Sequence, residues 1–336
     1  MKYRKLGWSG VLVSELCMGT MTFGWQADES TSFKIMDKFE EEGGNFIDTA
    51  NVYSDGKSEE IVGRWIKGRD RESFIIGTKV RFRTGNNPNS VGLSRKHILH
   101  SVRESLKRLG TDYVDILQLH AWDPLTPLEE TLSTMNYLVQ EGLIRYVGIS
   151  NFRGWQLQKA IDLCLEMGWE KPVSIQPQYN LIARATEYEI LPVASFNGLA
   201  VLPWSPLAGG VLTGKYEGGI DSAPKGTRVG DSKNKEYYVK MENDRTKSIL
   251  KALSTISEET GKKKSQIALN WLLSNPSVTS PIIGARNVEQ LVENLGASGW
   301  NLTRDQIERL NSASAIEITY PYDLRAEEQQ RRDRTI

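Results

Sequence analysis

The stretch FIDTANVYSDGKSEEIVGRWI, residues 46–66, begins as a buried strand and ends as a helix. Asp48 stands where the apolar run gives out, and Tyr53 follows five residues later on the loop between the two elements. A strand that is apolar at nearly every position is typical of a parallel sheet that is covered on both faces. The stretch therefore predicts one strand–helix unit with two polar side chains at the carboxyl end of its strand.

The same alternation of a short apolar run and a longer amphipathic stretch repeats along the chain. The predicted strands are LCMGT (16–20), FIDTA (46–50), FIIGTK (74–79), VDILQLH (114–120), YVGIS (146–150), VSIQ (173–176), LAVLPW (199–204) and SPIIG (280–284). Eight such units in a chain of 336 residues favour an α/β fold of the (β/α)8 TIM barrel type over a doubly wound sheet.

Two of the predicted helices have clear end signals. Ser94 can cap a helix that Gly110 ends. Thr126 with Glu129 three residues later predicts a capping box, with Pro127 at the first helical position of the next helix.

Three segments lie outside the repeat. Residues 1–15 contain two short strand-like pieces around WSG and predict a hairpin that closes the floor of the barrel. Residues 208–246 form a connection after strand seven that is longer than usual, and such loops are often functional. We expect residues 1–315 to form a single barrel domain and residues 316–336 a charged tail, which could border the pocket if it is ordered.

The composition bounds the classes of partner. Lys and Arg number 42, as do Asp and Glu, so no basic surface for nucleic acid or for an anionic membrane is indicated. No apolar run is long enough to span a membrane, and MKYRKLGWSG lacks the apolar centre of a signal peptide. Cys17 and Cys164 have no metal-binding spacing. We expect a cytoplasmic protein without a metal or disulfide framework.

Polar side chains end several of the predicted strands, and in a (β/α)8 barrel the active site forms at those ends. Asp48, Lys79 and His120 end strands two, three and four. A buried Lys79 would need Asp48 as its counter-charge. Tyr53 beside that ammonium is a candidate general acid, and we expect the ammonium to lower the pKa of the phenol. His120 could orient a carbonyl group.

The other two histidines, His97 and His100, lie at i and i+3 of one helix with no third ligand in the sequence. We therefore interpret them as surface residues of that helix and not as metal ligands.

A general acid without a candidate nucleophile suggests carbonyl reduction, which needs a hydride donor. No G-x-G-x-x-G motif opens a helix after a strand, so the barrel itself would have to bind the dinucleotide. Ser150, Asn151 and Gln176 offer groups that can hold a carboxamide, and Trp204 offers a flat face for a nicotinamide ring. After strand eight, Arg286 precedes a helix whose amino end can hold a phosphate.

These motifs together resemble the aldo-keto reductases, which are NADPH-dependent (β/α)8 barrels. FIDTANVY with GKSEEIVGRWI, GTKV, VDILQLH, GISNF, QPQYN, WSPLAGGVLTGKY and IIGARNVEQLVENL follow one another in the order of that family. The resemblance implies the catalytic tetrad Asp48, Tyr53, Lys79 and His120, in which Asp48 anchors Lys79, Lys79 tunes Tyr53, and His120 orients the carbonyl.

The resemblance also implies the cofactor and substrate contacts. Ser150, Asn151 and Gln176 would bind the carboxamide, Trp204 would stack on the nicotinamide, and the segment after strand seven would fold over the cofactor. The pyrophosphate contacts would be Ser205, Leu207, Gly209 and Lys215, and those at the adenosine end Gly284, Arg286, Gln290 and Asn294, with Arg286 favouring NADPH. The expected substrate pocket is lined by Phe23, Trp25, Phe82 and Trp122.

The leading interpretation is the NADPH-dependent reduction of an aldehyde or ketone, with sugar-derived and aromatic carbonyl compounds as candidates. The expected partner is a small-molecule carbonyl compound, and the sequence does not indicate an oligomeric state. One alternative is a nicotinamide-binding regulatory subunit that resembles the β subunits of voltage-gated potassium channels. Another is an aldolase with Lys79 as its Schiff-base nucleophile, which the neighbouring Asp48 disfavours because it would keep Lys79 protonated.

Overall fold

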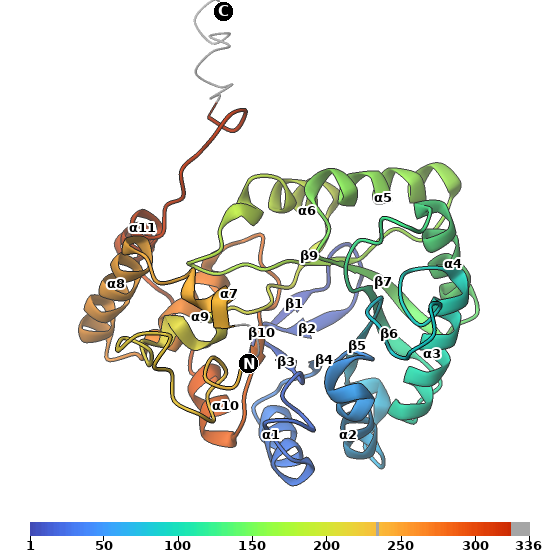
Figure 1. The fold of residues 1–336 in the computed structure, drawn as a ribbon, viewed down its shortest axis with the longest axis horizontal. Helices are drawn as coiled ribbons and strands as arrows, with labels where there is room; N and C mark the ends of the chain where they lie inside the picture. The colour runs from blue at the N-terminus through green and yellow to red at the C-terminus, as the bar shows by residue number, and fades with distance from the viewer. Residues whose placement is uncertain (233–234, 324–336) are drawn as a thin grey trace, which may run out of the picture.

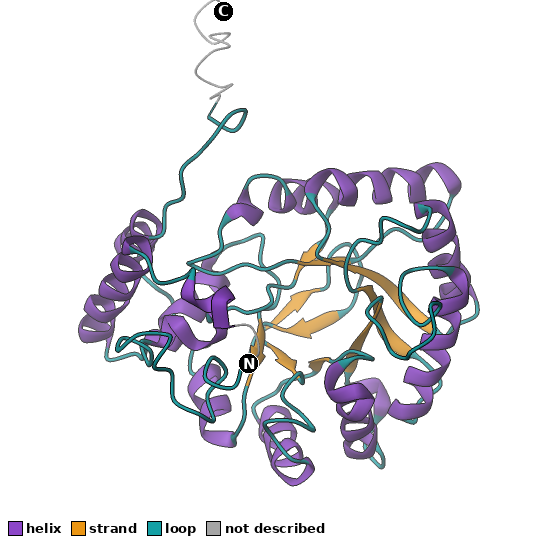
Figure 2. Ribbon diagram, viewed as in Figure 1, coloured by secondary structure: helices purple, strands orange, loops and turns teal. Residues whose placement is uncertain are grey.

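The computed structural model describes residues 1–232 and 235–323, and its centre is one sheet of eight parallel strands. The strands follow the order β10-β3-β4-β5-β6-β7-β8-β9 (Figures 1 and 2). They are β3 Cys17–Gly19, β4 Phe46–Asp48, β5 Ile75–Val80, β6 Val114–Leu119, β7 Ile144–Ser150, β8 Ser174–Gln176, β9 Ala200–Val201 and β10 Ile282–Gly284. Each lies within or next to its predicted run.

The two ends of the sheet meet and close it. The backbone N–H of Thr279 donates to the carbonyl of Val201 at 2.9 Å, and that of Ile282 to the carbonyl of Pro203 at 2.8 Å. These bonds join the segment leading into β10 to β9, and β10 itself pairs with β3. The prediction of a (β/α)8 barrel is confirmed.

Helices surround the strands (Figure 2). They are α1 Glu29–Glu41, α2 Lys57–Ile66, α3 Arg95–Leu109, α4 Leu128–Gln140, α5 Gly154–Met167, α6 Ile190–Asn197, α7 Lys235–Val239, α8 Asp244–Thr260, α9 Lys264–Ser274, α10 Val288–Leu295 and α11 Arg304–Ala313. No helix in the described ranges is both long and apolar enough to cross a membrane.

The end signals are confirmed for α3 but not for α4. The Ser94 hydroxyl accepts from the N–H of His97, and Gly110 ends α3 with a positive φ of 63°. In α4, the first helical residue is Leu128, and Pro127 precedes it in an extended conformation. The hydroxyl of Thr126 donates to the carboxylate of Asp123 at 2.7 Å. The predicted capping box is therefore wrong, because Asp123 holds the Thr126 side chain.

The predicted hairpin is present at the amino end of the barrel. Strands β1 Tyr3–Lys5 and β2 Leu12–Ser14 pair antiparallel. Leu6 and Val13 are fully buried in a small apolar cluster with residues near the amino ends of the barrel strands. Gly7 is required in the turn, since a Cβ there would lie 2.4 Å from the carbonyl oxygen of Val173. The hairpin thus closes one end of the barrel, as predicted.

The long segment between β9 and α8 contains a short 3₁₀ helix, η4 Ala208–Thr213, and the helix α7. Val229 and Tyr238 are buried and anchor it to the core. Its Asp231 accepts a hydrogen bond at 3.0 Å from the side-chain amide of Gln26, which belongs to the loop after β3. The segment therefore contacts a loop at the carboxyl end of a distant strand.

The chain beyond α11 packs against residues near α6. Tyr322 stacks on Tyr188 with ring centroids 4.8 Å apart, and the Tyr188 hydroxyl donates to the carbonyl of Glu317 at 2.7 Å. Of the predicted tail 316–336, residues 324–336 lie outside the described residues. The boundary at residue 315 stays a prediction.

Candidate active site

A buried ion pair lies at the carboxyl ends of β4 and β5. The ammonium of Lys79 donates to a carboxylate oxygen of Asp48 at 2.5 Å and to the carbonyl of Thr49 at 2.7 Å. The side chain of Lys79 is 0 % exposed and that of Asp48 is 3 % exposed. The register brings them together, because β4 and β5 are paired neighbours. The pairing expected from the sequence is present.

Tyr53 reaches the same ion pair from the loop after β4. The Lys79 ammonium donates to its hydroxyl oxygen at 3.0 Å. Ser54 and Asp55, which follow Tyr53, have positive φ values of 50° and 55°, a conformation that costs free energy in residues with side chains. The hydroxyl of Ser54 donates to the carbonyl of Phe23 at 2.8 Å and helps to hold this turn. The loop therefore places the phenol beside the ion pair at the end of the strand.

The electrostatics keep both groups protonated. Burial acts to lower the pKa of the Lys79 ammonium, but Asp48 and the phenol outweigh burial, and the pKa is raised. Burial raises the pKa of the Tyr53 phenol, and Lys79 offsets only part of that rise. The expectation of a lowered pKa for Tyr53 is corrected, because exclusion of water from the phenol outweighs the ammonium. A protonated Lys79 also disfavours a Schiff-base nucleophile.

His120 stands beside the phenol as a neutral imidazole. Its ring lies 6.0 Å from that of Tyr53 and 4.5 Å from that of Phe82, edge to face in both cases. Burial, and then the charges of Lys79 and Arg81, lower the pKa of His120 to about 2. A neutral imidazole retains one N–H donor, which is what orienting a carbonyl group requires.

Gln118 belongs to this network, although sequence reasoning missed it. Its side-chain amide donates to the second carboxylate oxygen of Asp48 at 2.8 Å, and that oxygen also accepts from Gln176 at 2.9 Å. Gln176 donates to the side-chain oxygen of Gln118 as well, at 2.9 Å. The signal was in the sequence: Gln118 lies two residues before His120 on β6, so the strand period places both on the barrel interior.

Strained backbone concentrates at the same end of the barrel. In the described residues, the non-glycine residues with positive φ are Ser54, Asp55, Arg81, Asn151, Ser205 and Ala208. All lie in the loops that follow β4, β5, β7 and β9. Strain of this kind collects at functional sites.

Several buried polar atoms at these strand ends find no hydrogen-bond partner within the described chain. They include both amide atoms of the Asn51 side chain, Nδ1 of His120 and Nε of Arg81. Such atoms are rare in protein interiors and call for a ligand or water. Asn51 was absent from the predicted site, although it lies between Asp48 and Tyr53.

The residues expected to hold the nicotinamide end lie next to one another. The Ser150 hydroxyl donates to the carbonyl of Gln176 at 2.8 Å. The amide of Asn151 donates to the carbonyl of His120 at 2.9 Å, and its oxygen accepts from the indole N–H of Trp204 at 3.0 Å. The wall beside His120 is thus built by residues from β7, β8 and the chain after β9.

The residues expected at the pyrophosphate lie in and beside η4. Gly209 needs its positive φ of 66°, and a Cβ there would lie 2.4 Å from the ring of Tyr238. Ser205 and Leu207 precede η4 directly, and the Lys215 ammonium follows it at 5.1 Å from the ring of Tyr216. Their hold on a pyrophosphate stays a prediction.

The residues expected at the adenosine end surround the start of α10. Asn287 caps this helix, and the side chain of Gln290 accepts from the backbone N–H of Arg286 at 3.1 Å. Asn294 donates to the carbonyl of Gly284 at 3.2 Å. Across the described residues, Arg286 has no carboxylate within ion-pair distance. The predicted helix after Arg286 is present, and its hold on a phosphate stays a prediction.

The four aromatic residues expected at the substrate pocket have different environments. Trp25 is half exposed, and Phe82 and Trp122 are partly buried. Phe23, in contrast, is fully buried in the main core, because the turn after β3 directs it inward. We therefore correct the expectation for Phe23, which presents no surface to a substrate in this structure.

The interpretation of His97 as a surface residue is wrong. Its side chain is buried on the inner face of α3, while His100 is exposed. Burial lowers the pKa of His97. In the described part of the chain, no group of three or more His, Cys, Asp or Glu side chains could hold a metal ion.

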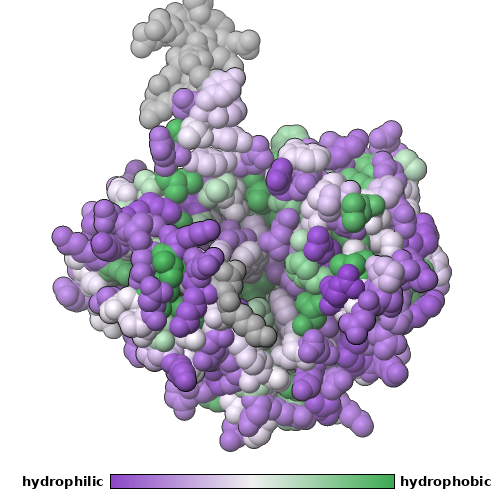
Figure 3. Space-filling view, in the orientation of Figure 1, coloured by the Kyte–Doolittle hydropathy of each residue, from purple (hydrophilic) through white to green (hydrophobic). Residues whose placement is uncertain are grey.

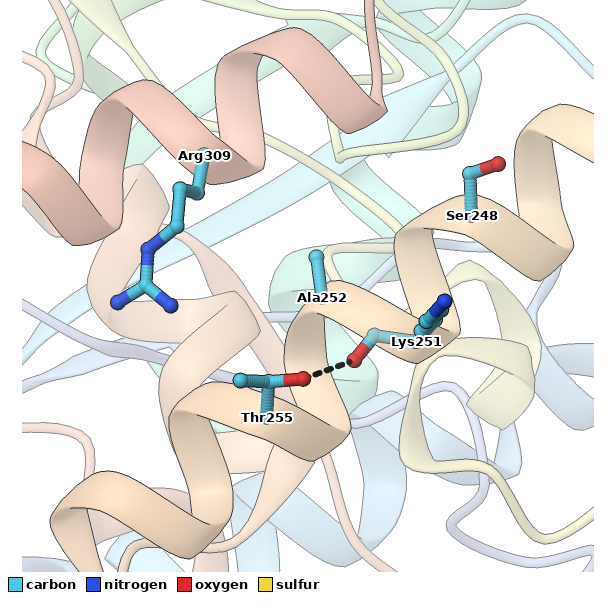
Figure 4. A pocket seen from close by; sticks show the side chains of 5 residues that line it. All are labelled: Ser248, Lys251, Ala252, Thr255 and Arg309. Atoms are coloured by element: carbon cyan, nitrogen blue, oxygen red, sulfur yellow. Dashed lines mark hydrogen bonds between the residues drawn. The ribbon is translucent and has the colours of Figure 1, made fainter.

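The surface of the molecule has depressions. The face seen in Figure 3 is hollowed near its centre. A second depression, between α8 and α11, is lined by Ser248, Lys251, Ala252, Thr255 and Arg309 (Figure 4). It contains none of the tetrad residues, and we assign it no function.

The barrel and its site define the class of protein. A model of the Aldo/keto reductase family matches residues 15–315, and the chain belongs to that family. The family carries out carbonyl reduction with a nicotinamide cofactor, so the protein is an oxidoreductase by family.

Three relatives illustrate its range. The chain is 40% identical over 301 residues to a probable voltage-gated potassium channel subunit beta of Oryza sativa subsp. japonica, covering 88% of this chain and 91% of the relative. It is 39% identical over 321 residues to an uncharacterized oxidoreductase of Bacillus subtilis (strain 168), covering 93% and 95%. It is 33% identical over 351 residues to a versiconal hemiacetal acetate reductase of Aspergillus parasiticus, covering 96% and 99%.

Proposed function

We propose that this protein reduces an aldehyde or ketone to the alcohol with NADPH and with Tyr53 as the general acid. The observation that carries the proposal is the buried chain of Asp48, Lys79 and Tyr53 beside the neutral His120. This arrangement places a proton donor and a hydrogen-bond donor side by side, and none of the four residues is a free nucleophile.

The four residues have separate roles in this mechanism. Tyr53 donates its proton to the carbonyl oxygen as negative charge develops there. The Lys79 ammonium, 3.0 Å from the phenol oxygen, stabilises the phenolate that remains. Asp48 keeps that ammonium charged and in place. His120 donates its N–H to the carbonyl oxygen and fixes the orientation of the substrate.

The residues present fit a nicotinamide dinucleotide. When bound, this cofactor supplies the hydride. Ser150, Asn151 and Gln176 would hold its carboxamide, and Trp204 would cover its ring. The unpartnered amide atoms of Asn51 lie in the same loop cluster and support a ligand there.

The far end of the dinucleotide would lie at β10 and α10. A Cβ at Gly284 would meet no atom within 4 Å, so space is open above the end of β10. Arg286 at the start of α10 would bind a 2′-phosphate by charge-assisted hydrogen bonds, which favours NADPH over NADH.

The test is a spectrophotometric assay of NADPH and NADH oxidation with aromatic aldehydes, dicarbonyls and open-chain sugar acids. We expect turnover above background with NADPH and a lower kcat/KM with NADH. Background rates on every carbonyl compound would refute the reductase proposal.

A second candidate function follows from the name of one relative, a probable potassium channel subunit beta. In this alternative, the protein binds the nicotinamide cofactor and acts as a regulatory subunit. Tight NADPH binding in a fluorescence titration, together with no turnover in the assay above, would favour it. Turnover comparable to that of reductases would favour the first candidate.

We also propose that residues 1–315 form one domain, that the small-molecule carbonyl compound is the partner, and that the protein works in the cytoplasm. Cys17 and Cys164 are both buried free thiols, as expected in a reducing compartment. Truncation after residue 315 should preserve cooperative unfolding, and cell fractionation tests the location.

A further inference from the structure

Arg81 directly follows β5, the strand that carries Lys79, and its guanidinium lies over the ring of Phe82. It is two residues from Lys79 and just beyond the last residue of the strand. Its φ of 156° is a strained value for a residue with a side chain. Backbone strain clusters at functional sites, so the strain at Arg81 suggests that its side chain is functional.

The guanidinium lies beside the residue that orients the carbonyl in the proposed mechanism. Its central carbon is 5.0 Å from the centroid of the Phe82 ring, and that ring is 4.5 Å from the ring of His120. The charge of Arg81 is also one of the causes, after burial and Lys79, that lower the pKa of His120. The charge of Arg81 is therefore close enough to act on the imidazole of His120.

Within the described ranges, the guanidinium of Arg81 forms no ion pair. Its Nε is buried without a hydrogen-bond partner, and the ion pairs of the described chain do not include it. Asp123 senses its charge, but the oxygens of that carboxylate are occupied by donors from Leu93, Leu125 and Thr126. An arginine this close to His120 and without an ion-pair partner is suited to an anionic ligand.

Arg83 provides a contrast within the same loop. It is exposed, and its guanidinium donates to the carbonyls of Gly85 and Asn87, both at 3.1 Å. Those bonds give Arg83 a structural role in the loop. Arg83 is therefore a matched control for the removal of one positive charge from this region.

The position of Arg81 separates it from the residues expected to bind the cofactor. Those lie in or after β7, β8, β9 and β10, whereas Arg81 follows β5, and its charge acts on His120 after β6. The guanidinium of Arg228 lies 5.2 Å from the centroid of the Trp25 ring, but Arg228 belongs to the long segment after β9 that would fold over the cofactor. The inference therefore rests on Arg81.

We propose that Arg81 forms an anion subsite beside His120 and that the substrate is an aldehyde or ketone that carries a carboxylate or a similar oxyacid group. This inference rests on the proposed reductase function. The planar guanidinium can bind a carboxylate through two parallel hydrogen bonds and so fix the distance between the anionic group and the carbonyl.

The experiment compares kcat/KM for pairs of aldehydes that differ only in charge. One pair is para-formylbenzoate and para-formylbenzamide, and a shorter pair is succinic semialdehyde and its amide. For at least one pair, the wild-type protein should prefer the anion by about tenfold or more, the worth of a charge-assisted hydrogen bond. In Arg81→Met and Arg81→Gln this preference should vanish, in Arg81→Lys part of it should remain, and in Arg83→Met it should persist.

Two results would overturn the subsite: no preference for the anion in either pair with the wild-type protein, or an equal preference in Arg81→Met. If no aldehyde of any kind is reduced, the reductase proposal fails separately. In that case, calorimetric titrations with benzoate and with benzamide test the subsite. Tighter benzoate binding that Arg81→Gln abolishes would support it, and equal binding of the two compounds would refute it.

Discussion

The barrel has an ion pair near each of its two ends, one fully buried and one mostly buried, and only the first has the surroundings of an active site. At the carboxyl end, Asp48 and Lys79 meet at 2.5 Å under the phenol of Tyr53. At the amino end, Asp115 on β6 and Arg71, in the 3₁₀ helix η2 Arg71–Ser73, meet at 2.7 Å.

The two pairs differ in what their remaining hydrogen bonds reach. Arg71 also donates to the carbonyls of Phe74 and Tyr113, and Asp115 accepts from the N–H of Ile76, so this pair ties local backbone together. Lys79 instead donates to the phenol of Tyr53, a group that can itself release a proton. A buried ion pair therefore does not by itself mark a site. The features that distinguish the Asp48–Lys79 pair are a titratable third group, strained loops and buried polar atoms without partners.

The most severe test removes the hydroxyl of Tyr53. In Tyr53→Phe the proton donor is lost, and we expect kcat to fall by about 10²–10⁴. The dissociation constant for NADPH should stay within about twofold, because the substitution removes only the hydroxyl and retains the aromatic ring. Steady-state kinetics and a fluorescence titration measure the two quantities. Wild-type turnover in this variant would remove Tyr53 from the mechanism.

The next test breaks the comparison between the two ion pairs directly. Lys79→Met should abolish turnover, whereas Arg71→Met should lower the free energy of unfolding by roughly 1.5–3 kcal/mol, since it removes a charge-assisted hydrogen bond from the mostly buried carboxylate of Asp115. Burial already raises the pKa of Asp115, so the loss should be smaller at acidic pH, where this carboxyl is protonated. Urea unfolding and kcat of the folded protein provide the readouts. A loss of turnover in folded Arg71→Met would show that both ends serve catalysis.

A smaller effect is expected from Gln118, which touches the site only through Asp48 and Gln176. Gln118→Leu leaves Asp48 with one amide donor fewer, and we expect kcat to fall about tenfold, since such a bond to a charged group is worth roughly 1.5–3 kcal/mol. Gln118→Glu is the control, because it keeps the shape but places a second carboxylate beside Asp48 and should lower kcat further. Unchanged kcat in both variants would reduce Gln118 to a packing role.

The smallest expected effect is that of pH on the rate of reduction. The protonated Tyr53 is the active form, and its raised pKa means that the proton is lost only as the pH rises above the ordinary phenol value of about 10. His120, with a pKa of about 2, stays neutral throughout the neutral range. The rate of reduction should therefore be flat from acidic to mildly alkaline pH. A change in rate with a midpoint near pH 6.5, the ordinary pKa of histidine, would contradict a neutral His120.

Much of the fold and of the tetrad could be predicted because both depend on patterns close in sequence. The strands are near-continuous apolar runs, and in a barrel of parallel strands all carboxyl ends meet on one face. Asp48, Lys79 and His120 stand at those ends, so the fold alone brings them together. Gln118 was missed because it lies inside an apolar run, where a polar residue has no visible partner until the strands are paired.

Other errors have a similar origin in contacts that are distant in sequence. Phe23 was expected to line the substrate pocket, but the turn after β3 packs it into the core. From the sequence, His97 was not assigned to the face of its helix that contacts the barrel. The cap of α4 was misread because Asp123 competes for the hydroxyl of Thr126.

By itself, the sequence determined the strand–helix repeat, the hairpin, and which polar residues end the strands, since these follow from local periodicity and from the parallel arrangement of the strands. Only the tertiary structure decided the protonation of the site. The pKa values of Tyr53 and His120 depend on how completely neighbouring elements exclude water, and the free charge of Arg81 depends on which carboxylates other loops bring near it. Burial and the pairing of charges are properties of the packed molecule, and no single stretch of sequence contains them.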